Sequence, residues 1–142
     1  VINDNPDYKF ELGKAVTLRE GTDVTIVANL LMSYRAQEAA KILEKEGISC
    51  EVIDPRSLLP FDYETVEASV KKTGKLMIVH EDTYTGAQVA AHFAEHNIFD
   101  LDAPVKIVAA YDTPIPFASP MENFVIPSTE RITEAARELA RF

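Results

Sequence analysis

The chain has 142 residues, of which 46% are hydrophobic and 26% charged, and its formal net charge is -9. This length suits one domain with its own buried core, and the composition is that of an ordinary globular protein. The acidic balance argues against nucleic acid or an anionic membrane as the main partner and favours a basic protein surface. The one cysteine, Cys50, excludes an internal disulfide, and no apolar run approaches the length of a membrane span.

The first residues have the composition of a linker. They read VINDNPD, without an initiator methionine, and such a stretch is typical of an extended segment. We therefore expect a piece of a longer protein, the alternative being a complete protein that has lost its first residue. The predicted organisation is an interdomain linker with a possible edge strand near residues 14–18, together covering residues 1–20, and one domain over residues 21–142.

Short apolar runs alternate with helical patterns along the rest of the chain. Strands are predicted at residues 24–28, 48–54, 76–79 and 105–110. Helices are predicted at residues 33–46, between Asp62 and Gly74, from Thr85 onward, and after Ser128. This alternation indicates an α/β fold, a three-layer sandwich around a mostly parallel sheet with both faces covered.

Capping signals and apolar stripes accompany these helices. Asp62 and Ser128 are candidate N-caps, and Thr85-x-x-Gln88 is a capping-box pattern. The stripe expected on the helix from Thr85 comprises Ala87, Ala90, Ala91, Phe93 and Ala94. The stripe expected on the last helix comprises Ile132, Ala135, Ala136, Leu139 and Phe142.

Residues 112–127 hold four of the eight prolines, which predicts a long irregular loop. A loop of this length in a compact domain is usually functional or interfacial. Asp112, at its start, is expected to cap a turn through its side chain, with ligand contact as the alternative.

The glycines form none of the fingerprints of nucleotide-binding loops. The sequence contains no GxGxxG, no Walker loop and no GxSxG. An open α/β sheet usually keeps its ligand site at the carboxyl ends of its strands, and here those loops lack the expected chemistry. The domain is therefore predicted to be a partner of an active site rather than its owner.

One polar cluster, His80-Glu81-Asp82, follows the predicted strand at residues 76–79. The functional interpretation is an acid–base or phosphate-contacting histidine, since histidine changes charge near neutral pH. The alternative is a strand-end histidine that hydrogen-bonds a neighbouring loop or subunit, and we favour it.

A second histidine motif, His92-Phe93-Ala94-Glu95-His96, matches the H-x-x-E-H pattern of some zinc proteases. A zinc site also needs a third ligand from another element, and none is identifiable. Two solvent-facing histidines on an alanine-rich helix are the favoured interpretation. Cys50 is expected to be a small apolar core residue.

Seven stretches together resemble the C-terminal domain of transketolase-type thiamine enzymes, and most closely that of the β subunit of 2-oxo acid dehydrogenases. They are residues 21–28, 39–52 (AAKILEKEGISCEV), 54–60, 72–75, 79–81, 101–105 and 111–116. The stretches follow the family's order and cover nearly the whole chain. Residues 79–81 and 111–116 look more like the branched-chain or acetoin-type enzymes than the pyruvate enzymes.

The resemblance implies that the enzyme decarboxylates a 2-oxo acid and acylates a lipoyl group. Thiamine diphosphate and Mg²⁺ would bind between an α subunit and another domain of the β subunit, so no catalytic, cofactor or metal position falls on these residues. The implied partners are the α subunit, a second β subunit and the small binding domain of an acyltransferase, a basic surface that an acidic domain suits. The expected location is the cytoplasm, or the mitochondrial matrix in a eukaryote.

The candidate interface residues are His80, Glu81, Asp82, Asp112 and Phe142, the last because it resembles the family's C-terminal end near the docking surface. Two rival interpretations stay open from the sequence. One is the matching domain of a transketolase or deoxyxylulose-phosphate synthase. The other is a free-standing regulatory module that binds a small anion near His80.

Overall fold

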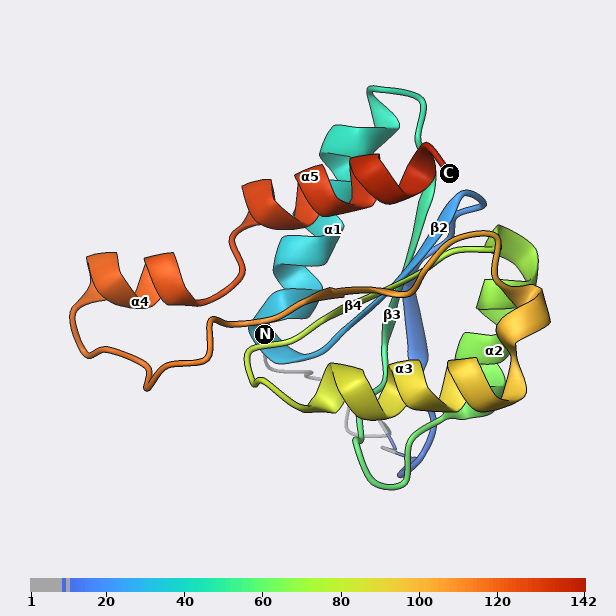
Figure 1. The fold of residues 1–142 in the computed structure, drawn as a ribbon, viewed down its shortest axis with the longest axis horizontal. Helices are drawn as coiled ribbons and strands as arrows, with labels where there is room; N and C mark the ends of the chain where they lie inside the picture. The colour runs from blue at the N-terminus through green and yellow to red at the C-terminus, as the bar shows by residue number, and fades with distance from the viewer. Residues whose placement is uncertain (1–8, 10) are drawn as a thin grey trace.

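The computed structural model describes residue 9 and residues 11–142, so residues 1–8 and 10 of the linker segment expected over residues 1–20 lie outside the described residues. The chain forms an open five-stranded sheet with helices on both faces (Figure 1). The strands are β1 (Val16–Arg19), β2 (Val24–Ala28), β3 (Cys50–Asp54), β4 (Leu76–Val79) and β5 (Lys106–Val108). Their order is β1-β3-β2-β4-β5, and all neighbouring pairs are parallel except β1 with β3. The predicted α/β class and mostly parallel sheet are confirmed.

Five α-helices and one 3₁₀ turn connect the strands of the described chain. They are α1 (Leu30–Glu44), α2 (Tyr63–Thr73), α3 (Thr85–His96), η1 (Ile98–Asp100), α4 (Ser119–Val125) and α5 (Thr129–Ala140). Helices α1 and α5 cover one face of the sheet, and α2 and α3 cover the other (Figure 1). Within the described residues, no helix has the length and apolar character that spanning a membrane requires.

Two buried clusters hold the three layers together, one on each face of the sheet. All five residues of β2 are buried, and successive strand side chains point to opposite faces. Ile26 therefore packs with α1 and α5, and Val27 packs with α2 and α3. Burying each large aliphatic side chain contributes about 1.5–3 kcal/mol, so β2 is the strand on which both clusters depend.

Several local predictions are confirmed by the backbone. The Thr65 N–H donates to the Asp62 carboxylate (3.2 Å) at the start of α2, and the Arg131 N–H donates to Ser128 Oγ (3.2 Å) at the start of α5. Helix α2 ends at Gly74, whose φ of 68° is in the left-handed region that glycine adopts at low cost.

The predicted start of the first helix is wrong by one turn. Helix α1 begins at Leu30, and the Ser33 hydroxyl donates to the Leu30 carbonyl (2.7 Å) inside the first turn. Ser33 therefore does not cap the helix. Serine occurs both at the N-cap and within the first turn of a helix, because its hydroxyl can hydrogen-bond nearby backbone groups in either position.

Three predictions near the C-terminal half also need correction. The proline-rich stretch at 112–127 is not wholly irregular, because Pro120 sits in the first turn of α4, where a missing N–H costs nothing. Phe142 follows the end of α5 and is 73% exposed, so it does not join that helix's apolar stripe. On α3 the buried residues are Gly86, Val89 and Phe93, whereas Ala87, Ala91 and Ala94 are exposed.

Candidate functional site at the carboxyl edge of the sheet

The carboxyl ends of the parallel strands meet where β2 and β4 lie side by side. Strand β2 is followed in the chain by β3, its neighbour on one side, and then by β4, its neighbour on the other side. Such a switch in strand order is the usual ligand position in open α/β sheets. His80 follows β4 at this point, and its N–H donates to the Val108 carbonyl of β5 (3.2 Å).

The His80 side chain is enclosed by its own loop and is 2% exposed. The Gly86 N–H at the start of α3 donates to Nε2 (3.1 Å), and Nδ1 lies 3.3 Å from Asp82 Oδ1. Because Nε2 accepts a hydrogen bond, the neutral ring carries its proton on Nδ1, facing Asp82. The Nδ1 contact is too poorly aligned to be a hydrogen bond, so Asp82 attracts the ring electrostatically.

Asp82, rather than Thr85, caps α3, which corrects the predicted capping box. Its carboxylate accepts from the N–H groups of Tyr84 and Thr85 (2.7 Å each) and from the Thr85 hydroxyl (2.7 Å). Partial burial raises the pKa of Asp82, but the hydrogen bonds from Thr85 and Tyr84 outweigh it and hold the pKa below its usual range. The loop 80–85 is therefore fixed at both ends.

This geometry favours a structural role for His80. Both ring nitrogens face groups of its own loop and helix, and the ring is too deeply buried for an anion to reach it. Neither the acid–base interpretation nor the anion-binding module gains support from the described residues. Glu81 differs, because its Oε1 is buried without a partner among the described residues, and an unmade bond of this kind costs about 1–3 kcal/mol.

Gly86 is required for the His80 contact. A Cβ at this position would lie 2.4 Å from His80 Nε2 and 2.9 Å from Ile107 Cγ2. We expect Gly86→Ala to lower the free energy of unfolding by about 1–3 kcal/mol, as overpacking does. Urea denaturation followed by circular dichroism measures it. In the double variant Gly86→Ala with His80→Ala, the losses in the free energy of unfolding of the two single variants should not add. Strictly additive losses, or a Gly86→Ala variant as stable as the parent chain, would contradict this packing.

The switch point itself does not hold a cofactor-sized cavity. The pit between β2 and β4 has a volume of about 10 Å³ and is lined mainly by apolar side chains, with His80 and Thr85 at its mouth. Across residue 9 and residues 11–142, no three His, Cys, Asp or Glu side chains gather as metal ligands would. The pit at the switch point is therefore too small for thiamine diphosphate.

The H-x-x-E-H motif on α3 is likewise engaged in packing. His92 Nε2 lies 2.8 Å from Glu67 Oε1 of α2, and its ring stacks on Tyr63 with centroids 3.7 Å apart. His96 lies 3.6 Å from the neighbouring Glu95 carboxylate, and its ring centroid lies 4.7 Å from that of His92. Cys50 is buried, as predicted, and burial raises the pKa of its thiol to about 12.

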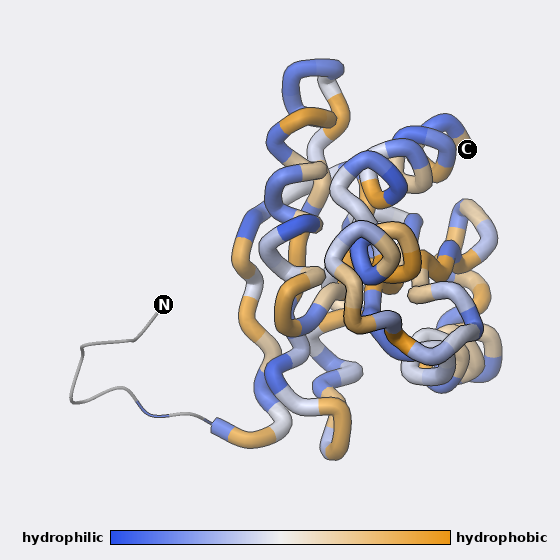
Figure 2. The backbone as a smooth tube through the Cα atoms, turned by 90° about the vertical axis from the view of Figure 1, so that its left-hand side faces the viewer, coloured by the Kyte–Doolittle hydropathy of each residue, from blue (hydrophilic) through white to orange (hydrophobic). Residues whose placement is uncertain are grey.

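An extended apolar surface surrounds the switch point. Every loop or helix start that follows a parallel strand exposes large apolar side chains, which we call the apolar rim. Its members are Leu30, Leu31, Tyr34, Leu58, Leu59, Tyr84, Tyr111, Ile115, Phe117, Met121 and Phe124. Figure 2 shows that hydrophobic residues lie on peripheral loops as well as within the layers. Patches of this extent in a globular protein usually mark interaction sites.

Helix α4 carries part of the rim on an arm that projects from the body (Figure 1). The arm is held at its base, where the Tyr111 N–H donates to the Val125 carbonyl (3.1 Å) and Arg131 lies 4.5 Å from the Tyr111 ring centroid. Phe117, two residues before the start of α4, is fully exposed, at 107%. The arm therefore combines a fixed base with exposed apolar side chains.

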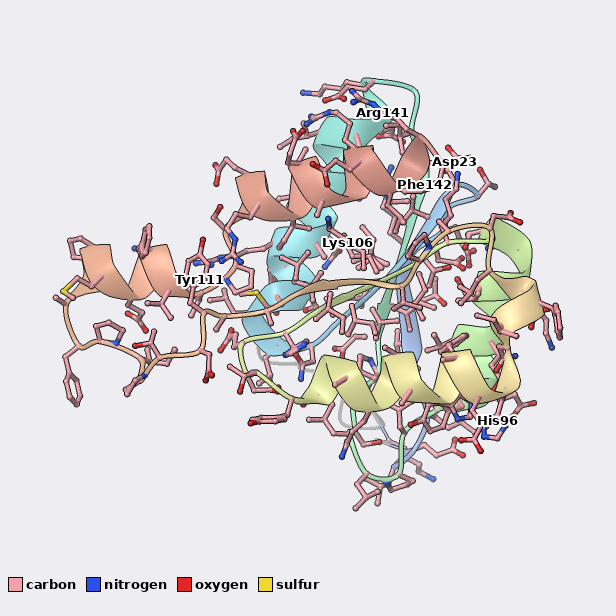
Figure 3. All side chains as sticks on the ribbon, viewed as in Figure 1. Asp23, His96, Lys106, Tyr111, Arg141 and Phe142 are labelled. Carbon is pink, nitrogen blue, oxygen red and sulfur yellow. The ribbon has the colours of Figure 1, made fainter. Side chains whose placement is uncertain are left out.

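The predicted interface residues fall into two groups. His80, Glu81, Asp82 and Asp112 lie at the carboxyl edge, whereas Phe142 lies on a different side of the molecule from Tyr111 (Figure 3). The carboxylate of Asp112 is exposed and has no hydrogen-bond partner among the described residues, so the predicted turn cap is wrong. The interface role of all five residues stays a prediction.

One buried polar cluster was not predicted from the sequence. Thr25 of β2 bonds Ser69 (2.6 Å) and Thr73 (2.7 Å) of α2, and Ser69 also bonds Glu51 of β3. Glu51 is 3% exposed and pairs with Lys72 Nζ at 2.6 Å. Its sequence signal is one polar residue within each of the two apolar runs that form β2 and β3, Thr25 and Glu51.

Comparisons with known proteins agree with the fold. The model of the transketolase C-terminal domain matches residues 13–132. The β subunit of Bacillus subtilis 2-oxoisovalerate dehydrogenase is 43% identical over 140 residues, which are 96% of this chain and 43% of that protein. The mitochondrial pyruvate dehydrogenase β subunit of Dictyostelium discoideum is 42% identical over 138 residues, which are 95% of this chain and 39% of that protein.

Solved structures give the same result. A split-gene transketolase, described as an inactive β4 tetramer, superposes with a TM-score of 0.84 at 32% identity, over 96% of this chain and 45% of that one. Pichia stipitis transketolase has a TM-score of 0.59 at 18% identity, over 92% of this chain and 18% of that one, which shows the fold alone. This chain thus spans less than half the length of these relatives. It belongs to the transketolase C-terminal domain family and is similar along nearly its whole length to the β subunits of 2-oxoisovalerate and pyruvate dehydrogenases.

Proposed function

We propose that this chain is the C-terminal domain of the β subunit of a thiamine diphosphate-dependent 2-oxo acid dehydrogenase, and that it serves assembly and docking. The holoenzyme decarboxylates a 2-oxo acid and acylates the lipoyl groups of an acyltransferase. The partners of this domain are the α subunit, a second β subunit and the acyltransferase's subunit-binding domain. Its compartment is the cytoplasm, or the mitochondrial matrix in a eukaryote.

The observation that carries this proposal is the apolar rim. Single exposed apolar residues are normal on any protein, but here every loop after a parallel strand exposes them, and Leu59 reaches 91%. Leaving so much apolar surface in water is unfavourable, and covering it contributes about 25 cal/mol per Å². A surface of this kind is explained by neighbouring domains or subunits that bury it.

The path of the chain supports the same role. The Gly13 N–H donates to Ser57 Oγ (3.0 Å) in the loop that carries Leu58 and Leu59. The described chain therefore begins at the rim. In a longer β subunit the preceding domain would join this one beside the rim and would cover part of it.

Thiamine diphosphate and Mg²⁺ belong, in this proposal, to other parts of the holoenzyme. The pit at the switch point is far too small for the cofactor, and the His, Cys, Asp and Glu side chains of the described residues form no group that could hold a metal ion. This domain then contributes by holding its neighbours in place. Its net charge of -9 favours encounter with a basic binding domain.

Rim substitutions in the full α–β enzyme test the proposal. We expect Leu59→Asp or Phe124→Asp to weaken assembly at least about tenfold, because each places a charge in a buried apolar contact. Sedimentation velocity of the co-expressed subunits would show a smaller fraction of full complex. Ile42→Asp is the matched control, since Ile42 is also exposed but lies about 18 Å along α1 from Leu30. Full assembly of both rim variants, or an equal defect in the control, would contradict the proposal.

A further inference from the structure

The two ring nitrogens of His80 lie in unequal surroundings. Nε2 accepts the Gly86 N–H (3.1 Å) in the first turn of α3, and the side chain is 2% exposed. Nδ1 lies 3.3 Å from Asp82 Oδ1 without forming a hydrogen bond. A neutral imidazole ring has one acceptor nitrogen, whereas a protonated ring has none. The hydrogen bond between Gly86 and His80 can therefore exist only while the ring is neutral.

We propose that His80 is a proton-sensitive latch, which holds loop 80–85 closed against the start of α3 when its ring is neutral and releases the loop when its ring is protonated. In the closed loop, a protonated Nε2 would point an N–H at the Gly86 N–H. Turning the ring by half a turn would put a C–H there instead. Both arrangements leave the buried Gly86 N–H without an acceptor, which is unfavourable.

The charged groups around the ring do not compensate for this loss. Asp82 is the one carboxylate within ion-pair distance of the ring in the described chain. Its Oδ1 already accepts the N–H groups of Tyr84 and Thr85, and its side chain is 47% exposed, so water screens its attraction for a charged ring. The residues of β2, α3 and the loop before α2 that share the pit with His80 are all uncharged, and β5 contributes the Val108 carbonyl, which accepts the His80 N–H.

A charged ring also has no space to move inward. The pit beneath it has a volume of about 10 Å³ and is lined mainly by apolar side chains, which disfavour an ion without its water. Protonation therefore drives the loop outward. Glu81 favours the same movement, because its Oε1 is buried without a partner among the described residues and would reach water in the open loop.

The position of the latch connects it with the apolar rim. Figure 1 shows the loop between β4 and α3 at the end of the sheet from which the arm α4 projects. Tyr84 lies on this loop, is 78% exposed and is a member of the rim. Release of the loop would displace Tyr84 and uncover the pit behind it, so the shape of the rim would depend on pH. The consequence for assembly rests on the proposed function, whereas the latch is a property of this chain alone.

Amide hydrogen exchange of the 142-residue chain, resolved by NMR, tests the latch. The protection factor of an amide compares its exchange rate with that of an unstructured peptide at the same pH. We expect the protection factor of the Gly86 amide to fall at least about tenfold between about pH 8 and about pH 5, the range in which histidines change charge. The Thr25 amide, which donates to the Lys75 carbonyl (2.9 Å) in the centre of the sheet, should keep its protection factor.

Two substitutions separate the proton from the contact. In His80→Gln the side-chain carbonyl can accept the Gly86 N–H but does not titrate, so the Gly86 protection factor should be nearly equal at both pH values. His92→Gln removes a histidine that lies beside Glu67 instead and should leave the fall unchanged. Far-UV circular dichroism confirms that each variant is folded at both pH values.

A further measurement needs no variant. In the parent chain, the ring carbon shifts of His80 and the amide shift of Gly86 should change together as pH is lowered. Transitions of these two signals at different pH values, a constant Gly86 protection factor, or an equal fall in His80→Gln would each overturn the inference. None of these outcomes affects the rim experiment on the full enzyme, so failure of the latch is distinguishable from failure of the proposed function.

Discussion

Gly21→Ala is expected to remove a large share of the stability of this chain. A Cβ at position 21 would lie 2.2 Å from both the carbonyl carbon of Cys50 and the backbone nitrogen of Glu51. These atoms belong to β3, which pairs with the central strand β2, so no flexible side chain can move aside. The expected cost is about 4 kcal/mol or more, out of a total of roughly 5–15 kcal/mol for a domain.

Gly47→Ala is the matched control for this prediction. Gly47 has a φ of 83°, but a Cβ there meets nothing within 4 Å. Alanine at this position should cost only about 1–2 kcal/mol, the price of the left-handed backbone. Urea denaturation of both variants measures the difference. Equal free energies of unfolding for Gly21→Ala and Gly47→Ala would show that the backbone of β3 can move away from a side chain at position 21, contrary to the packing described.

Lys72→Met is expected to leave the buried Glu51 carboxylate without its charged partner and so to lower the free energy of unfolding. Glu51 is 3% exposed, and Lys72 Nζ lies 2.6 Å from its Oε1. Removing one partner of a buried pair costs about 3–5 kcal/mol; because the Lys72 side chain is 42% exposed, water screens the pair and we expect about 2–3 kcal/mol. Lys71→Met, one position away on the exposed side of α2, should change stability by less than about 0.5 kcal/mol.

The stability of the Lys72→Met variant should depend on pH in a direction that the pKa of Glu51 determines. Burial raises the pKa of Glu51, but hydrogen bonds from Lys72 and Ser69 outweigh it and lower the pKa overall. In the parent chain this stabilisation is complete above the unfolded pKa of about 4.3 and is lost as pH falls through the folded pKa. Without Lys72, burial dominates and raises the pKa of Glu51, so the variant gains stability as pH falls from 7 toward 4. The difference in the free energy of unfolding between the parent chain and Lys72→Met should therefore become smaller as pH falls from 7 toward 4. A difference that grows over this range would contradict the pairing of Glu51 with Lys72.

The predictions from sequence that succeeded depend on local chemistry. The strands at residues 24–28 and 76–79, the Asp62 and Ser128 caps and the stop at Gly74 follow from residues within one turn or strand of each other. Short-range hydrogen bonds and backbone preferences decide such features before the chain is folded.

The predictions that failed depend on which side of an element faces inward. Alanine is compatible with both faces of a helix, so the alanines of α3 gave no orientation, and the larger Val89 and Phe93 determine it. Asp82 displaced Thr85 as the cap because a three-residue turn brings it to the helix start. The apolar rim could not be predicted from the sequence, because the exposure of its side chains is set by contacts between distant segments.

The apolar rim is the surface on which the proposed docking role depends. The apolar rim lies at the carboxyl edge, where related sheets often bind ligands, and here the loop 80–85 closes that edge through His80 and Asp82. In the proposed function, the domain positions neighbouring chains, and the cofactor binds elsewhere in the holoenzyme.

Calorimetric titration of thiamine diphosphate with Mg²⁺ tests this central claim most directly, with the full α–β enzyme as the positive control. The enzyme should give a saturable heat, and this 142-residue chain should give none beyond dilution. Saturable binding by the chain alone, with a Kd in the micromolar range, about -8 kcal/mol, would contradict the assignment of cofactor binding to the rest of the holoenzyme.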